Sequence, residues 1–381
     1  MTIKNERPVI RYNNVALLKS KSPAFSEASN SGENIKFLPR VQNLDFDFSL
    51  PKNTLETISS KNLQNHFYNP GVDVNLNINL IENFDGIFLD YFDGTELVEN
   101  IDKDINIYAI ISETLEQDAI NENIDSFDMV SFGNCQLQGF SMSQSVNGLI
   151  NSEYSFVAVN VLAERVSGVS GVFSGDLPAL DLTGDQTNKI SGVSAKFNFS
   201  GLDEKMSDSS IIGEVFPSYK TNVTISGLNF LIETDSIQSF DFGADISKKN
   251  IYTIGKKHPI KRKAVFPMEG NFSVSNKISS FTLNQNSVKE QKDLREYLRD
   301  NRFYNITITS EDLNGGTIEM QIPSGRLDRQ SYSSSVGSDL ECNLDFSFDL
   351  FGMNNSVNSI LTKPTSGYLQ TKLSENISRK V

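Results

Sequence analysis

Apolar and polar residues alternate along several short segments of the chain, and a period of two residues is typical of a half-buried β-strand. The clearest segments are residues 44–50, 72–80 and 344–350, where Leu, Ile, Val or Phe occupies every second position. Residues 222–232 are a further candidate strand. Phe and β-branched residues suit such a pleated surface. The pattern predicts a mainly β protein of the antiparallel sandwich or barrel type.

One segment has the period of an amphipathic helix instead. Ser287 and Glu290 have the spacing of a capping box, and an apolar stripe at i, i+3 and i+4 begins at Leu294. This predicts a helix over residues 287–300 that packs one face on a sheet. We expect a shorter counterpart near residues 94–101.

The chain contains an internal repeat. Three pairs of segments match in the same order, and they are 41–58 with 237–254, 110–115 with 308–313, and 137–156 with 327–346. Their offsets are 196, 198 and 190 residues, which is the drift that loop insertions produce. A repeat of this length predicts a tandem duplication.

The repeat and three low-hydrophobicity stretches predict the domain organisation. We expect a first domain at residues 1–165, a linker at 166–176, a second domain at 177–352 and a C-terminal arm at 353–381. Ser, Gly and Asn are frequent in the linker and the arm. Residues 19–35 have a similar composition and predict a mobile loop within the first domain.

Charge is unevenly distributed along the chain. The formal net charge is −14, and all of this excess lies in the first 190 residues. Between Glu82 and Asp128 the only basic residue is Lys103, whereas a basic cluster spans Lys248 to Lys263. These segments are either ordinary solvated surface or complementary faces between copies of the chain. Nucleic-acid binding by the basic cluster is a third interpretation, which the acidic whole-chain field opposes.

The residue types that carry catalysis and metal binding are scarce. The two cysteines, Cys135 and Cys342, are far apart, and no Cys/His cluster or glycine-rich phosphate loop is present. His66 and His258 have no ligand-type neighbours in sequence. We therefore expect no enzyme activity, no catalytic residues, no metal and no cofactor.

Targeting signals are also missing from the sequence. The apolar runs are far shorter than the roughly 20 residues that cross a bilayer. The segment from Met1 to Arg7 lacks the apolar region of a signal peptide. The expectation is a chain without a membrane span that stays in a reducing cytoplasm.

Residues 41–80 and 237–274 resemble a recurring element of bacteriophage tail tube proteins. In that element a strand with alternating aromatic residues is followed by a polar turn, a Pro and a second alternating strand. The second copy resembles it most closely, and the matching residues are Gly255, Lys256, Lys257, Lys261, Arg262, Phe266 and Pro267. Stretches 133–143 and 174–179 also resemble tail structural proteins.

The resemblance implies a fold and an assembly. It implies tandem tail-tube-like β-sandwich domains, each with one flanking helix. Six such units form a ring, so three two-unit chains would make a pseudo-hexameric ring, and stacked rings would conduct genomic DNA without binding it specifically. The protein would be assembled in the bacterial host cytoplasm, become part of the virion tail, and contact sheath, baseplate or terminator proteins. Type VI secretion tubes are more distant relatives.

Two groups of residues are candidate contact sites under this interpretation. Candidate subunit contacts are Lys256, Lys257, Lys261, Arg262 and Lys263. A candidate acidic lumen or complementary face comprises Asp85, Asp90, Asp93, Glu96 and Glu99, which lack the spacing of a calcium-binding loop. An acidic channel wall would repel DNA phosphates. The first copy has Lys61–Leu63 in place of the basic cluster, so the two units are not interchangeable.

Alternative functions remain open at this point. A baseplate hub, distal tail or neck protein could use the same domains, and its copy number per virion would distinguish it from a tube. A β-rich adhesin or carbohydrate-binding protein is a second alternative, which tight glycan binding would favour. A secreted hydrolase is a third, although the chain lacks a nucleophile constellation and an export signal.

Overall fold

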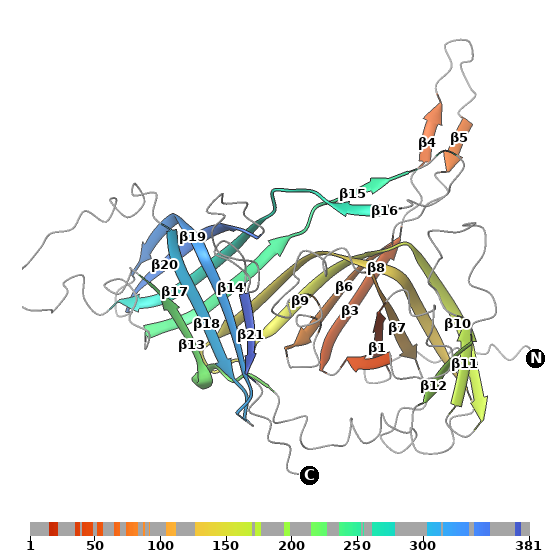
Figure 1. Ribbon diagram of the computed structural model, residues 1–381, viewed down its shortest axis with the longest axis horizontal. Helices are drawn as coiled ribbons and strands as arrows, with labels where there is room; N and C mark the ends of the chain where they lie inside the picture. The colour runs from red at the N-terminus through yellow and green to blue at the C-terminus, as the bar shows by residue number, and fades with distance from the viewer. Residues whose placement is uncertain are drawn as a thin grey trace, which may run out of the picture.

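The protein is mainly β, as the alternation predicts (Figure 1). The computed structural model describes residues 15–21, 35–38, 40–48, 52–55, 65–68, 74–82, 87, 91, 104–111, 126–169, 172–176, 194–198, 215–226, 236–252, 254, 261–278, 303–313, 315–334, 339–350 and 370–374. The assigned strand pairings in this part of the chain are all antiparallel. None of its helical segments is long and apolar enough to span a bilayer.

The strands fall into two groups along the chain. The first group is β1 (Val15–Lys21), β2 (Ile35–Leu38), β3 (Val41–Phe48), β4 (Lys52–Leu55), β5 (Asn65–Tyr68), β6 (Val74–Ile81), β7 (Ile105–Ile111), β8 (Ser126–Ser145), β9 (Asn151–Ala158), β10 (Asn160–Val169), β11 (Val172–Asp176) and β12 (Ser194–Asn198). The second is β13 (Thr221–Ile225), β14 (Ile237–Asp245), β15 (Lys248–Ile251), β16 (Lys261–Ala264), β17 (Glu269–Ile278), β18 (Phe303–Glu311), β19 (Thr317–Ser333), β20 (Leu340–Asp349) and β21 (Gln370–Ser374), preceded by the 3-10 turn η3 (Ser218–Lys220).

The same set of strand pairings occurs twice. In the first half, β3 pairs with β6, β6 with β9, β9 with β8 and β8 with β7. In the second half, β14, β17, β20, β19 and β18 repeat this order. The outer strands β1 and β10 correspond to β13 and β21, and hairpin β4–β5 corresponds to β15–β16. We call β1–β10 module 1 and β13–β21 module 2.

Irregularities in the strands recur at matching positions. The pairing register of β3 shifts at Gln42 and that of β14 at Gln238, 196 residues later. The register of β8 shifts at Gln138 and that of β19 at Asp328, an offset of 190. A one-residue shift exchanges the faces of all later side chains. The two modules therefore place corresponding side chains on corresponding faces.

Each module consists of two packed sheets that share one long strand (Figure 1). The first half of β8 pairs with β7 and β10, whereas its second half pairs with β9. Asn134 lies at the change of partners and has a φ of 52°, a left-handed conformation that Asn tolerates better than most residues. In module 2, β19 passes between sheets in the same way, from β18 and β21 to β20.

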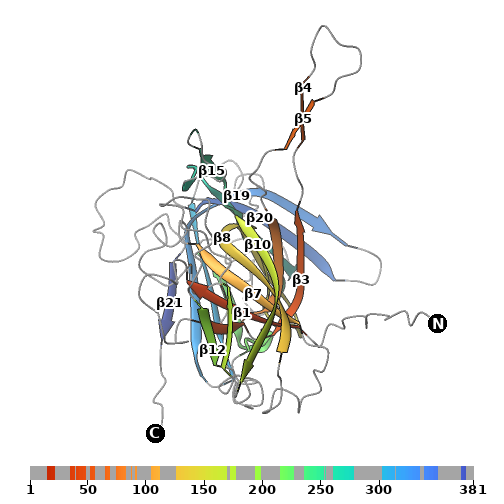
Figure 2. The ribbon, with the colours of Figure 1, turned by 90° about the vertical axis from the view of Figure 1, so that its right-hand side faces the viewer.

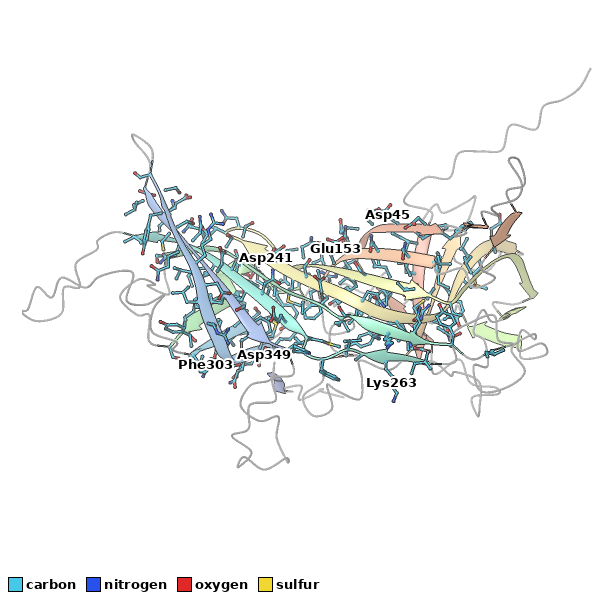
Figure 3. All side chains as sticks on the ribbon, turned by 90° about the horizontal axis from the view of Figure 1, so that it is seen from above. Asp45, Glu153, Asp241, Lys263, Phe303 and Asp349 are labelled. Atoms are coloured by element: carbon cyan, nitrogen blue, oxygen red, sulfur yellow. The ribbon has the colours of Figure 1, made fainter. Side chains whose placement is uncertain are left out.

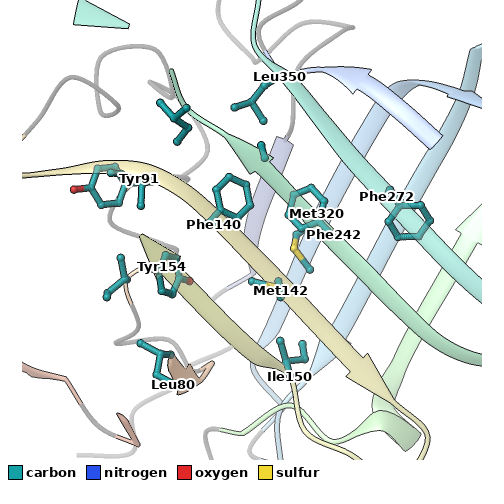
Figure 4. Close-up of a cluster of buried hydrophobic side chains, with 14 of the residues drawn as sticks. Leu80, Tyr91, Phe140, Met142, Ile150, Tyr154, Phe242, Phe272, Met320 and Leu350 are labelled. Atoms are coloured by element: carbon teal, nitrogen blue, oxygen red, sulfur yellow. The ribbon is translucent and has the colours of Figure 1, made fainter. Parts of the chain in front are cut away.

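Buried aromatic and aliphatic side chains fill the space between the sheets. Figure 4 shows Phe140 and Met142 of module 1 beside Phe242 and Met320 of module 2. The ring centroids of Phe140 and Phe242 are 5.4 Å apart in an edge-to-face arrangement. The hydrophobic core therefore continues from one module into the other.

The predicted helices, linker and C-terminal arm lie wholly or partly outside the described residues. The predicted helices at 287–300 and 94–101 lie outside the described residues, so one flanking helix per domain stays a prediction. Between β6 and β7 the two described residues, Ile87 and Tyr91, are helical and buried. The predicted linker, 166–176, contains the end of β10 and all of β11, and the predicted C-terminal arm contains β21. The domain boundaries stay a prediction.

Candidate functional site

The two modules are joined edge to edge inside the chain. Strand β14 pairs with the second half of β8, in register from Ser239 opposite Ser145 to Asp245 opposite Gly139. One sheet therefore runs through both modules in the order β3, β6, β9, β8, β14, β17, β20, β19. We call the contact between β8 and β14 the intrachain junction.

The intrachain junction is closely packed. Phe242 is fully buried there, and a backbone N–H of Ile246 donates to the carbonyl oxygen of Gln138 at 2.6 Å. At Gly243, a Cβ would lie 2.7 Å from the carbonyl oxygen of Phe140, so this position requires glycine. The junction has the features of an ordinary sheet interior and not those of a loose domain contact.

The two ends of this long sheet carry the counterparts of the strands that form the junction. Among the described strands, β3 pairs with β6 alone, and its counterpart in module 2 is β14. The segment Leu327–Ser333 of β19 pairs with β20 alone in that part of the chain, and its counterpart in module 1 is the junction half of β8. We call these two outer borders the β3 edge and the β19 edge. Among the described residues, no further strand pairs with either edge, and a sheet border of this kind can accept another strand.

Side-chain exposure differs sharply between the junction and the β3 edge. Phe46 is 44% exposed and Phe48 is 58% exposed, although Phe46 also contacts the ring of Phe132 at a centroid distance of 5.1 Å. Their counterparts at offset 196 are Phe242 and Ala244, which are 0% and 5% exposed. The difference arises because β8 covers β14, whereas no described strand covers β3. Two partly exposed aromatic side chains next to each other at a sheet border are a candidate interaction site.

The sheet face opposite the core is lined with small polar side chains. One row across the junction consists of Ser143, Asp241, Ser273 and Asp345. Figure 3 shows Asp45, Glu153 and Asp241 along the same side of the sheet. By register, the charged residues of this face are Asp45, Asp47, Glu153, Asp241, Asp245, Glu269, Glu341, Asp345 and Asp349 with Lys277, Arg326 and Arg329. We call it the polar face, and its charge is mainly negative.

A shallow hollow of about 560 Å³ lies on the polar face around the junction. Its lining includes Ser143, Asp241 and Arg329. Partial burial raises the pKa of the Asp241 carboxyl. The hydroxyl of Ser273 donates to Asp345 at 2.8 Å, which is a structural hydrogen bond between neighbouring strands. No group of three or more metal-ligating side chains occurs among the described residues.

The hairpin β15–β16 of module 2 contacts module 1. Arg262 is buried, and its guanidinium donates to the carbonyl oxygen of Val157 on β9 at 3.1 Å. Burial raises the pKa of the nearby Asp104 carboxyl, while the hydrogen bond from Gln136 and the charge of Lys248 partly oppose that shift. The basic hairpin therefore covers a partly buried acidic site.

Some sequence-predicted contact residues can be placed in the structure. Arg262 contacts module 1 of its own chain, Lys261 lies in β16, and Lys263 is exposed. Lys256 and Lys257 lie outside the described residues. The predicted acidic group, Asp85, Asp90, Asp93, Glu96 and Glu99, also lies entirely outside them. The β3 and β19 edges were not predicted from the sequence, although the repeat offset of 196 residues aligns Phe46 with Phe242.

Both cysteines are expected to be unreactive in the folded protein. Burial raises the pKa of Cys135 above its ordinary range and the pKa of Cys342 to about 11. At pH 8 only about 0.1% of Cys342 would then be thiolate, the form that reacts. We expect a disulfide reagent at pH 8 to label native protein at least about 100-fold more slowly than guanidinium-unfolded protein. Labelling of either thiol at the unfolded rate would contradict the buried placement.

Comparison with known proteins does not identify a family. No family model matches the chain, and no curated protein matches it.

Proposed function

We propose that the protein is a structural subunit of a bacteriophage tail tube, which assembles when the β3 edge of one copy pairs with the β19 edge of the next. The observation that supports this proposal is the intrachain junction. There, the counterparts of these two edges already form a continuous antiparallel sheet. Repeating the same contact between chains would satisfy the border N–H and C=O groups.

The intrachain junction specifies a register for the contact between chains. Asp241 opposite Ser143 corresponds to Asp45 opposite Ser333 of the next copy, at offsets of 196 and 190. In the same way, Phe46 would lie opposite Tyr332, and Phe48 opposite Gln330. The exposed Phe46 and Phe48 would then be covered as Phe242 and Ala244 are.

Side-chain size and charge are complementary in this register. In the intrachain junction a small Ala244 lies opposite a large Phe140, whereas between chains a large Phe48 would lie opposite a smaller Gln330. Asp47 would lie diagonally opposite Arg329, within reach of an ion pair. Asp47 occupies the position of Gly243, whose Cβ would clash in the intrachain junction. The contact between chains should therefore be slightly wider at this row.

The proposed contact is head to tail, because its two surfaces are different. Such contacts either close into a ring or continue as an open helix. The resemblance to tail tube proteins favours closure with three copies, in which six modules form a pseudo-hexameric ring. Stacking of these rings would give the tube, and proteins of the tail such as sheath, baseplate or terminator components would be its partners.

The polar face suits the wall of a DNA-conducting channel. It carries mainly Ser, Asn and acidic side chains, and its acidic residues outnumber its basic ones. Phosphates would be repelled by such a wall, and the short side chains would leave the channel wide. This supports passage of DNA without specific binding.

Cysteine pairs provide the test of the contact between chains. Asp45→Cys combined with Ser333→Cys should give disulfide-linked dimers and closed trimers on mild oxidation. The matched control is Asp241→Cys with Ser143→Cys, which occupies the corresponding intrachain positions and should cross-link within one chain. Exclusively monomeric products from the first pair, while the control cross-links, would overturn the proposal. Electron microscopy of the linked product distinguishes stacked tubes from the single ring of a baseplate hub.

A further inference from the structure

Hairpin β15–β16, which we call hairpin 2, fastens module 2 onto module 1 next to the intrachain junction. Its Arg262 reaches across to the Val157 carbonyl oxygen, and its positive charge lies near Asp104. Asp104, Gln136 and Val157 form the site that hairpin 2 covers. Within this site the side-chain amide of Gln136 donates a hydrogen bond to the Asp104 carboxyl. Strand pairing and hairpin docking therefore act together at this junction.

Hairpin β4–β5, which we call hairpin 1, is the counterpart of hairpin 2 in module 1. Both hairpins connect corresponding strands, β3 to β6 and β14 to β17, and their pairing registers match at offset 196. In Figures 1 and 2 the strands of hairpin 1 extend beyond the end of β3, and Figure 2 shows them apart from the packed sheets. Because hairpin 2 follows β14 and contacts the module that pairs with β14, hairpin 1, which follows β3, would contact the module that pairs with the β3 edge.

Module 2 contains the counterpart of the site that hairpin 2 covers. Asp104 corresponds to Phe303, since Ile105 and Tyr304 occupy equivalent register positions before the shifts in β7 and β18. Gln136 corresponds to Arg326 and Val157 to Ser347. Phe303 is 56% exposed in the isolated chain. The site in module 1 is covered by hairpin 2, whereas its counterpart in module 2 presents an exposed aromatic residue, Phe303.

The chemistry of the two hairpins matches the chemistry of the two sites. Hairpin 2 has the sequence Lys261–Ala264 in its second strand, which is basic, and it covers an acidic residue. The aligned strand of hairpin 1 is Asn65–Tyr68, with His, Phe and Tyr, and its counterpart site presents Phe303. Aromatic residues gain most by burial against other aromatic surfaces. The basic hairpin 2 therefore lies on a site with an acidic residue, and the aromatic hairpin 1 has a counterpart site with an exposed aromatic residue.

We propose that hairpin 1 docks on module 2 of the neighbouring copy, over Phe303, Arg326 and Ser347, as hairpin 2 docks on module 1 of its own chain. This inference rests on the proposed pairing between chains and adds a second contact to it. The partner is a second copy of this chain. Neighbouring copies in the ring would then be joined by hairpin 1 as well as by the pairing of the β3 edge with the β19 edge.

Photocrosslinking from Phe303 tests the docking directly. Phe303 is replaced by p-benzoylphenylalanine in the full chain, and the protein is mixed with an equal amount of isotopically labelled wild-type chain. After irradiation, the expected product joins position 303 to a peptide containing residues 65–68 of a different copy. Crosslinks to other segments, or to hairpin 1 of the same chain, would overturn the proposal. The same replacement at exposed Tyr219 is the control, and it should not give this product.

A hairpin variant separates the docking from strand pairing. His66→Ser with Phe67→Ser and Tyr68→Ser should leave ring formation intact and raise the rate of ring dissociation at least about tenfold, since apolar burial is lost. Unchanged dissociation would overturn the docking while leaving the proposed function in place. If the wild-type chain forms no oligomer at any concentration, both the docking and the proposed function are wrong.

Discussion

Replacing Phe46 and Phe48 together with lysine should abolish oligomers and leave the monomer folded. Phe46 is 44% and Phe48 is 58% exposed in the isolated chain, so their loss should lower the free energy of unfolding by only about 1–2 kcal/mol. In the proposed contact both become buried beside Tyr332 and Gln330. Burying the exposed halves of two Phe side chains contributes about 1.5–3 kcal/mol, and burying an unpaired lysine charge at a sheet border costs at least about as much again. We therefore expect the dissociation constant of each contact to rise by about 10² to 10⁴.

Sedimentation at increasing protein concentration measures this effect. The control is Tyr219→Lys, which changes an aromatic residue of η3 that is 76% exposed. The residues before it, Pro217 and Ser218, contact the turn between β8 and β9 in the middle of the sheet order. That variant should assemble as the wild type does. Normal assembly of the double lysine variant would mean that the β3 edge is not the contact surface. Unfolding of the variant, seen by circular dichroism, would contradict the exposure of these residues.

Phe242→Ala should be severely destabilising, whereas Phe46→Ala should not be. Phe242 is fully buried, and its ring contacts those of Phe140 and Phe348. Truncation of a buried Phe costs about 3–5 kcal/mol, because transfer free energy is lost and a cavity remains. Its counterpart Phe46 is 44% exposed, so the same truncation should cost about 1 kcal/mol in the monomer.

Urea denaturation of dilute, monomeric protein measures both values. The pair is informative because the two residues occupy the same position in the repeat, and β8 pairs with the strand of Phe242 while no described strand takes that place beside Phe46. Equal losses of stability would show that β8 contributes nothing to the burial of Phe242. At concentrations where the wild type assembles, Phe46→Ala should become the variant that weakens the oligomer.

The sequence predicted the faces of the strands well but not their neighbours. Alternation is a local property, so residues 74–80 could be assigned a buried and an exposed face before the structure was known. The offset of 196 between the matching segments is also the offset between the register shifts at Gln42 and Gln238. The sequence match of residues 110–115 has an offset of 198, whereas the strand pairings make Ile306 of β18 the counterpart of Ile107 of β7, which is an offset of 199. Aligning identical residues therefore placed this strand one residue out of register.

The candidate site depends on long-range pairing and could not be predicted from local patterns. Phe46 and Phe242 lie in matching segments of the repeat, and Phe242 is buried where β14 pairs with β8, whereas no described strand pairs with β3 on that side. Likewise, Arg262 belongs to a basic cluster that suggested contacts between copies, yet it binds the Val157 carbonyl of its own chain. Sequence periodicity predicts which side chains face the core, but only the strand topology shows which segment packs against them.

Continuity of the sheet through β8 and β14 has a mechanical consequence for any assembly of this chain. In a closed ring, every second contact between modules would be an intrachain junction, held by the polypeptide, and could open only with the help of local unfolding. The remaining contacts would be non-covalent alone, so a stressed ring should fracture there and release intact chains. Fusing two modules also holds the intrachain junction at a high effective concentration, independent of how dilute the protein is.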